Sequence, residues 1–370
     1  MTGLEPVQFG RYEVLRPIGD GGMAQVYLCV RRGAGGFERR VVLKVLHSRF
    51  IGHDDVVEMF LQEARLLARM NHQNIVGVFE VECIDGVPYL AMEYVQGPTL
   101  GQLQRHVGRP GPDTLGYFLH VIRQVCDGLH HAHTLTVGGQ PAGVVHRDVS
   151  SQNIVIDAAS GCAKLIDFGI AKALDADHHT HIGILKGRLH YIAPEVLDGA
   201  RPDARADLYA VGVLLHRLSF GRMPYHESEL VGKRAPIALP ADELRGFPDG
   251  LAETIVRALS ANPQDRHDSA AELGAELQGV VDVMRIHQGQ VAVFVGRVFP
   301  RGEEDWQRSQ EAPGNTLHTS LQRLASEVSE PAIPQGTGAS LMLILGASVV
   351  LALSAFATAV LVIAASVVSR

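Results

Sequence analysis

Short β-like runs, mostly apolar, alternate with one helical stretch in the first quarter of the chain. Short apolar runs of this kind favour β-strands, and the clearest are residues 12–18, 25–29, 41–46 and 89–94. Between the third and fourth runs, apolar side chains recur at the spacing of a helix, at Phe60, Ala64, Leu67 and Met70. The pattern predicts a small β-rich lobe over residues 10–95.

Helical periodicity prevails over residues 96–285. Residues 117–133 and 206–219 show it most clearly, and stretches rich in glycine, proline and aspartate divide the segments. We therefore predict an α+β fold with two lobes, in which a larger helical lobe follows the β-rich one.

The pattern changes twice beyond residue 285. Residues 286–338 are polar and contain many prolines and glycines, which predicts a juxtamembrane linker, flexible from Glu303 onward. Within it, residues 290–299 are apolar enough to pack, either as helix or as strand. Residues 339–368 contain no charge, and a helix from Leu341 would be about 42 Å long. A bilayer core of about 30 Å needs less, so we predict a transmembrane helix over 339–368 rather than a buried core helix.

Composition and charge remove several classes of function. The net charge of −7 provides no broad basic surface, so nucleic acid is not an expected partner. The four cysteines lack paired spacing, which argues against a zinc site and a disulfide framework. The first twelve residues contain no apolar stretch typical of a signal peptide.

A glycine-rich turn joins the first two predicted strands. Its sequence, Gly19-Asp20-Gly21-Gly22-Met23-Ala24, lets backbone N–H groups approach phosphate oxygens. Alone this signal is weak, because glycine turns join many hairpins.

Lys44 lies within the apolar third run, where a lysine is usually an edge residue. The sharper hypothesis is an ammonium directed into a cleft between the lobes, paired with a carboxylate. Glu63 lies on the apolar face of the predicted helix beside Phe60 and Leu67, and Glu58 is the alternative.

Three motifs follow in order: residues 146–153 (HRDVSSQN), 167–169 (DFG) and 193–195 (APE). Together with the glycine turn and Lys44, this set resembles the bacterial, eukaryotic-like (Hanks-type) Ser/Thr protein kinases over about residues 12–283. The resemblance implies a bilobed kinase fold that uses ATP and Mg²⁺, with Mn²⁺ as an alternative.

The resemblance also assigns roles to single residues. Catalytic roles fall to Asp148, which receives the substrate hydroxyl proton, and to Lys44 and Asn153, and metal ligation falls to Asn153 and Asp167. Expected nucleotide contacts are Ile18, Gly19, Gly21, Gly22, Ala24, Val26, Lys44, Glu63, Glu93 and Val95. Asp207 and Gly212 resemble the D-x-x-x-x-G start of a kinase helix, and Arg266 resembles the late arginine that pairs with Glu195.

Two positions depart from the kinase pattern. Ser150 stands where Ser/Thr kinases usually carry lysine, and Arg188 follows Gly187 where threonine is usual. We hypothesise that Arg188 supplies the missing cation for the γ-phosphate; the alternative is a weakened enzyme. Thr180, the one hydroxyl residue between Gly169 and Gly187, is the expected site of autophosphorylation, where its phosphate would bind Arg147.

Three functions compete. An active Ser/Thr protein kinase is preferred to a membrane-tethered pseudokinase scaffold, because a scaffold has no need of the complete set of motif residues. A small-molecule phosphotransferase is disfavoured by residues 191–195, which resemble a peptide-binding loop. Tyrosine specificity is disfavoured because the catalytic loop lacks the arginine and alanine of tyrosine kinases.

The apolar segment leads to an expected location. We expect a single-pass protein of the cell (inner) membrane with its kinase domain in the cytoplasm, where ATP is found, and with almost nothing beyond the membrane. Charge supports this orientation little, since Arg370 follows the segment. Expected partners are proteins bearing serine or threonine, the membrane, and a second copy met transiently during autophosphorylation.

Overall fold

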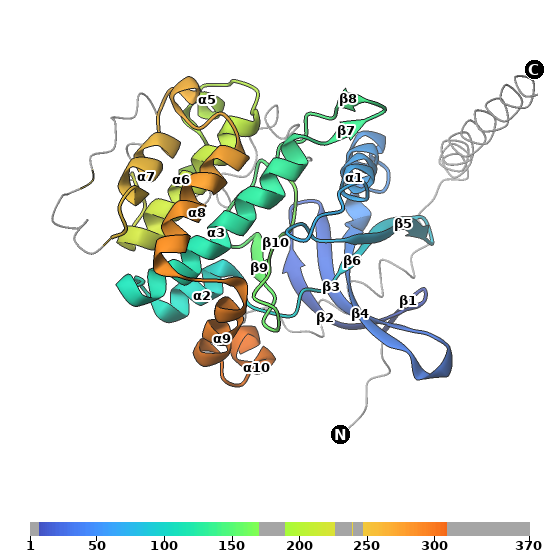
Figure 1. Ribbon diagram of the computed structural model, residues 1–370. Coiled ribbons are helices and arrows are strands. Elements are labelled where there is room, and N and C mark those ends of the chain that lie inside the picture. Colours follow the sequence, from blue (N-terminus) through green and yellow to red (C-terminus); the bar gives the residue numbers. More distant parts are fainter. Residues whose placement is uncertain (1–6, 170–188, 226–238, 240–246, 309–370) are drawn as a thin grey trace, which may run out of the picture.

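The computed structural model describes residues 7–169, 189–225, 239 and 247–308. A twisted sheet with one helix forms the N-terminal lobe, and a bundle of helices forms the C-terminal lobe (Figure 1). The two-lobed α+β architecture is therefore as predicted. A short hinge after residue 93 joins the lobes.

One antiparallel sheet forms most of the N-terminal lobe. Its spatial order is β1-β2-β3-β4-β6-β5, and the strands are β1 (Val7–Phe9), β2 (Tyr12–Asp20), β3 (Ala24–Arg32), β4 (Glu38–Leu46), β5 (Val78–Ile84) and β6 (Val87–Glu93). The four predicted strands are β2, β3, β4 and β6. The predicted helix is α1 (Asp54–Leu67), which packs against β5 and β6.

The two faces of this sheet have different neighbours. Leu43 of β4 belongs to a cluster of aromatic and aliphatic side chains on one face. Val42, on the opposite face, belongs to a larger core that includes α1 and continues into the C-terminal lobe. Because successive side chains on a strand alternate, Lys44 shares the face of Val42.

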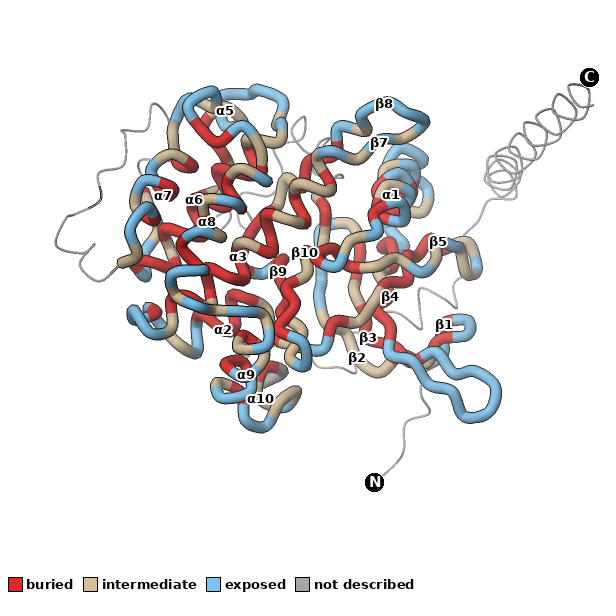
Figure 2. Tube along the Cα trace, in the orientation of Figure 1, coloured by how far each residue is buried: buried red, intermediate tan, exposed pale blue. Residues whose placement is uncertain are grey.

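The helices described in the C-terminal lobe are α2 (Leu100–Val107), α3 (Pro112–His133), α5 (Pro194–Leu197), α6 (Ala204–Phe220), α7 (Leu251–Ala258) and α8 (Ala270–Met284). The long helices α3 and α6 form its centre, and Figure 2 shows their traces largely buried. Both helical segments predicted here, 117–133 and 206–219, lie within α3 and α6. A hairpin of β9 (Ile154–Ile156) and β10 (Ala163–Leu165) lies between the lobes and connects the motif at residues 146–153 to the motif at residues 167–169.

Residues 133–143, which exceed the usual turn length, form a small hairpin. Its strands are β7 (Thr136–Val137) and β8 (Gln140–Pro141). Gly138 and Gly139 between them both have positive φ, 60° and 79°, as a type I′ turn requires.

The structure differs from the linker predicted over residues 286–338. Residues 286–308, here named the C-terminal extension, contain α9 (Gln288–Val298) and α10 (Glu303–Arg308). Val291 and Val295 are fully buried, and the ring of Phe294 stacks on Tyr117 at 4.5 Å. The packing predicted for residues 290–299 is thus observed, as a helix, whereas α10 stands where a flexible chain was predicted from Glu303. Residues 309–338 of the predicted linker lie outside the described residues.

The predicted membrane segment, 339–368, lies outside the described residues. Among the helices of the described ranges, none has both the length and the apolarity needed to cross a bilayer.

Candidate active site

Lys44 forms the centre of the site. Its Nζ lies 2.8 Å from Oε1 of Glu63 on α1 and 3.2 Å from Oδ1 of Asp167, which follows β10. The side chain of Glu63 is 4% exposed and that of Lys44 13%. The predicted pairing of Lys44 with Glu63 is thus confirmed, whereas Glu58 pairs with Arg65 on the exposed side of the helix.

This arrangement fixes the charge of Lys44. Burial alone would lower the pKa of its ammonium, but the charges of Asp167 and Glu63 outweigh burial and raise the pKa well above its usual value. Lys44 is therefore a fixed cation at neutral pH, suited to hold phosphate oxygens.

The glycine-rich turn is anchored from the segment that follows Lys44. Nε2 of His47 lies 3.1 Å from the carbonyl oxygen of Gly21, and the guanidinium of Arg49 donates to the carbonyl of Gly22 at 2.5 Å. Within the turn, the N–H of Gly21 donates to the carbonyl of Ala24 at 2.9 Å. No motif in the sequence indicated these anchors.

Apolar side chains adjoin this turn on both strands. Val26 of β3 is the register partner of Lys44, and Ile18 of β2 packs against the main core. The predicted nucleotide-contacting positions of the N-terminal lobe therefore gather around Lys44.

Asp148 and Asn153 lie together in the catalytic loop. Nδ2 of Asn153 donates to both the carbonyl oxygen and Oδ2 of Asp148, at 2.8 Å each. Because these bonds fix the amide nitrogen, Oδ1 of Asn153 is the atom left to face a metal ion. Asp167 comes alongside because the N–H of Ile166 donates to the carbonyl of Asn153 at 3.0 Å.

Asp207 at the start of α6 holds the backbone of the catalytic loop. Its carboxylate accepts from the N–H groups of His146 (2.8 Å) and Arg147 (2.9 Å), and contacts Nε2 of His133 at 2.8 Å. Arg147 has a positive φ of 64°, a strained conformation for a side-chain-bearing residue. Burial alone would raise the pKa of Asp207, but the bond with His133 and its other partners lower it.

The segment 167–169 is tied to the same loop. The ring of Phe168 lies 4.4 Å from that of His146, and the N–H of Gly169 donates to the carbonyl of His146 at 2.8 Å. Asp167 also has a positive φ, 55°. These contacts direct its carboxylate toward Lys44.

The hinge keeps the side chain of Glu93 occupied. Oε2 of Glu93 lies 3.1 Å from Nζ of Lys164 and accepts from the N–H of Gly77 at 3.2 Å. A nucleotide contact at Glu93 would therefore use its main-chain carbonyl. Val95, the other predicted hinge contact, is buried.

Other expected features are distributed as follows. Arg266, fully buried, forms a bidentate pair with Glu195, with both N–O distances 2.7 Å, as predicted. Gly212 is required because a Cβ there would lie 2.9 Å from that of Ala258. Arg188 and Thr180 lie outside the described residues.

The residues present fit a nucleotide with Mg²⁺. Asp167 and Asn153 offer hard oxygen donors from two sides, and such donors suit Mg²⁺. Within the described ranges, no group of three or more histidine, cysteine, aspartate or glutamate side chains is arranged to hold a metal.

Comparisons with known proteins agree with this geometry. A family model described as "Protein kinase domain" matches residues 12–270. MasK of Myxococcus xanthus, called a tyrosine-protein kinase, is 37% identical over 286 residues (75% of this chain, 44% of MasK). Pkn1 of Myxococcus xanthus, called a serine/threonine-protein kinase, is 33% identical over 356 residues (90% of this chain, 49% of Pkn1). The chain thus spans about half the length of these two relatives.

A third relative and a solved structure are closer in length. PknL of Mycobacterium tuberculosis, called a serine/threonine-protein kinase, is 33% identical over 288 residues (76% of this chain, 68% of PknL). The crystal structure of the PknI kinase domain from Mycobacterium tuberculosis superposes with a TM-score of 0.54 at 28% identity, covering 76% of this chain and 100% of that domain. On its motifs, its fold and these matches, the chain belongs to the protein kinase family.

Proposed function

We propose that this chain is an active protein kinase that transfers the γ-phosphoryl group of ATP to serine and threonine hydroxyls of proteins. One observation carries the proposal: Lys44 lies between Glu63 and Asp167, at 2.8 and 3.2 Å. A pseudokinase scaffold gains nothing from a buried, correctly charged lysine in this position.

Each residue has a task that its geometry supports. Lys44 holds the phosphates, and Asp148, oriented by Asn153, accepts the proton of the incoming hydroxyl. Mg²⁺, when bound by Asn153 and Asp167, neutralises phosphate charge. The glycine turn, fixed by His47, covers the phosphates with backbone N–H groups.

The acceptor is proposed to be serine or threonine, as the names of Pkn1 and PknL indicate for those proteins. Tyrosine is a second candidate, because MasK is called a tyrosine kinase. Position 150 has neither the lysine typical of Ser/Thr kinases nor the arginine of tyrosine kinases. It is a buried serine, with no hydrogen-bond partner for its Oγ within the described ranges.

The test is to incubate the full chain with Mg²⁺ and γ-labelled ATP, then to identify the phosphorylated amino acids. Label on serine or threonine that disappears in Asp148→Asn supports the proposal. Label on tyrosine alone would transfer it to the second candidate. ATP binding without label on the chain or on a generic acceptor protein would favour the scaffold.

We propose further that the kinase phosphorylates Thr180 of a second copy and binds that phosphate through Arg147. Nε of Arg147 is buried and lacks a hydrogen-bond partner among the described residues. Phosphosite mapping of the same sample tests this, with Thr180→Ala as the matched variant.

We also propose that Arg188 supplies the cation that Ser150 does not. Arg188→Ala tests this compensation, and full activity of that variant would exclude it.

The apolar segment 339–368 is proposed to anchor the chain in the cell (inner) membrane, with the kinase domain on the cytoplasmic side where ATP is available. Its support is the uncharged sequence itself. Tethering in a plane raises local concentration and so favours reaction between copies. Carbonate-resistant membrane association that is lost on deletion of 339–368 is the expected result, and release of the intact chain by carbonate would oppose it.

A further inference from the structure

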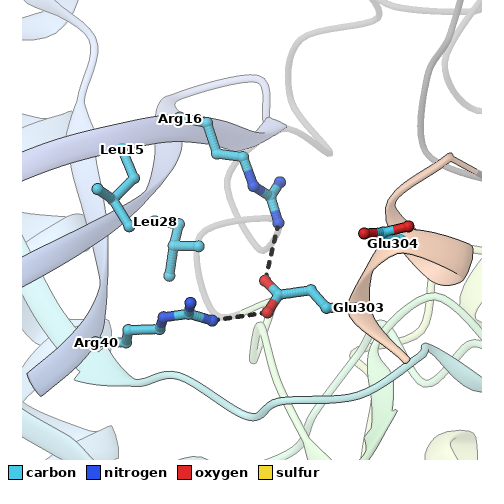
Figure 3. A pocket seen from close by; sticks show the side chains of 6 residues that line it. All are labelled: Leu15, Arg16, Leu28, Arg40, Glu303 and Glu304. Carbon is cyan, nitrogen blue, oxygen red and sulfur yellow. Dashed lines mark hydrogen bonds and ion pairs between the residues drawn. The ribbon is translucent and has the colours of Figure 1, made fainter. Parts of the chain in front are cut away.

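Glu303, the first residue of α10, points toward Arg16 of β2 and Arg40 of β4 in the N-terminal lobe (Figure 3). Oε2 accepts a hydrogen bond from Arg40 of β4 at 2.7 Å, and Oε1 accepts one from the hydroxyl of Tyr94 in the hinge at 2.9 Å. Arg16 of β2 approaches Oε1 to 3.9 Å. A single carboxylate thus gathers donors from two strands and the hinge.

α10 itself is attached to the C-terminal lobe. The amide of Gln102 in α2 donates to the backbone carbonyl of Trp306 at 2.8 Å. Trp306 is 5% exposed and meets the ring of Phe299 edge-on at 6.0 Å. α9, immediately before it, packs on α2 and α3. The C-terminal extension is therefore a second connection between the lobes, besides the hinge.

This connection lies on the nucleotide-facing side of the sheet. Arg40 and Lys44 are four residues apart in a regularly paired strand, so they share a face, about 13 Å apart. Leu28 stands two residues from Val26, also on that face. With Leu15, Arg16, Arg40, Glu303 and Glu304, Leu28 lines a pocket of about 350 Å³ (Figure 3).

We propose that Glu303 is a positioning residue for nucleotide binding, which fastens the sheet and the hinge to the C-terminal lobe and so sets the width of the cleft. The proposal rests on the proposed kinase function. It goes beyond that function because the family match ends at residue 270, before the extension begins.

The physical chemistry of Glu303 suits this task. Burial alone would raise the pKa of its carboxyl, but hydrogen bonds from Arg40 and Tyr94 lower it below the usual value, so the carboxylate is ionised at neutral pH. Nucleotide binding needs Lys44 from one lobe and Asp167 from the other at a fixed separation. A clamp between the lobes makes that separation available before the nucleotide arrives, and preorganisation of this kind raises affinity.

The experiment measures binding of Mg²⁺ and a non-hydrolysable ATP analogue to the full chain and to Glu303→Gln. We expect a dissociation constant raised roughly 3- to 10-fold. A carboxylate that accepts from several charged and hydroxyl donors contributes more binding free energy than an isolated ion pair on the surface. KM for ATP should rise by the same factor, with kcat within about twofold. Arg40→Gln should weaken binding less, and the double variant should be no worse than Glu303→Gln alone.

Glu58→Gln is the matched control, because Glu58 also pairs with an arginine at 2.8 Å but within one helix of one lobe. Its nucleotide affinity should equal that of the wild-type protein. Equal affinity of folded Glu303→Gln and wild type would overturn the clamp while leaving the kinase proposal intact. Failure of the wild-type protein to bind the analogue would overturn the kinase proposal, and the clamp with it.

Discussion

The cleft and the C-terminal extension each contain a carboxylate that gathers donors from distant elements, but in different surroundings. Around Lys44, the paired side chains of Lys44 and Glu63 are 13% and 4% exposed. Around Glu303, the side chains of Arg40 and Glu303 are 48% and 21% exposed. Similar chemistry is therefore placed once in a desolvated site and once near water.

Solvent decides what each group contributes. Removal of one partner from a buried pair leaves an uncompensated charge, which is strongly unfavourable. A partly exposed pair loses less, because water and salt screen the charges that remain. Burial therefore keeps the charges around Lys44 strong, whereas water and salt weaken those around Glu303.

The largest effect is expected from Lys44→Met. Loss of the fixed cation should lower kcat/KM for ATP roughly 10²- to 10³-fold, the range observed when one preorganised donor is removed. Steady-state kinetics measures it, with thermal unfolding as a check that the variant folds. The comparison fails if Glu303→Gln lowers kcat/KM as much as Lys44→Met does.

The same contrast explains what the sequence could predict. Lys44, Asp148, Asn153 and Asp167 stand in contiguous motifs, and the face of α1 selected Glu63 over Glu58. Glu303 offered no such signal, because it stands 263 residues from Arg40 along the chain.

The packing of residues 290–299 was predictable from their apolar side chains, but their helical form was not, and α10 was not predicted at all. Both helices are short, with 11 and 6 residues, and glycines interrupt the sequence around them. α9 is ordered by packing against α2 and α3, and α10 by the contacts of Trp306 with Gln102 and Phe299, which join distant parts of the chain.

A second effect concerns the support of the catalytic loop. Asp207→Asn keeps the side-chain shape but removes the charge that accepts from His146 and Arg147 at 2.8 and 2.9 Å. Hydrogen bonds to a charged group contribute about 1.5–3 kcal/mol each, so we expect the free energy of unfolding to fall by about 3 kcal/mol. Denaturant unfolding is the measurement.

Asp203→Asn provides the control for Asp207. Asp203 caps the same helix by accepting the N–H of Arg205 at 2.8 Å, and asparagine caps as well as aspartate. Its stability should be unchanged. If both variants unfold alike, the charge of Asp207 has no special role in the cleft.

Trp306→Ala tests the extension from its apolar side. Removal of this indole should lower the free energy of unfolding by about 2 kcal/mol, less than the 3–5 kcal/mol typical of a fully enclosed tryptophan. It should also weaken nucleotide binding about as much as Glu303→Gln, because α10 loses the contact between the rings of Trp306 and Phe299. Calorimetry of unfolding and of nucleotide binding gives both quantities.

Val293→Ala is the matched change within the same extension, since Val293 is 55% exposed on α9. Both its stability and its nucleotide affinity should stay at the wild-type level. Weaker nucleotide binding in Val293→Ala would show that the effect is not specific to the buried side of the extension. Undiminished binding in Trp306→Ala would show that the packing of α10 does not support nucleotide binding.

The smallest effect is a dependence of the free energy of unfolding on pH, caused by His120 on α3. Burial, with help from the nearby charges of Arg123 and of His287 beside α9, lowers the pKa of His120 on α3 to about 4. The unfolded chain, with an ordinary histidine pKa of about 6.5, binds this proton more readily. Stability is therefore unaffected at pH 7 and falls as the pH drops from about 6.5 toward 4, by about 1 kcal/mol near pH 5.5.

His120→Gln should reduce this slope in a series of denaturant unfolding curves between pH 5 and 7. His146 in the cleft also has a pKa lowered by burial, so part of the slope should remain. His53→Gln, at an exposed position, is the matched histidine substitution, and its stability at pH 7 should equal that of the wild-type protein. A slope equal in His120→Gln and wild type would assign the acid sensitivity to the other histidines whose pKa burial lowers, His146 and His72.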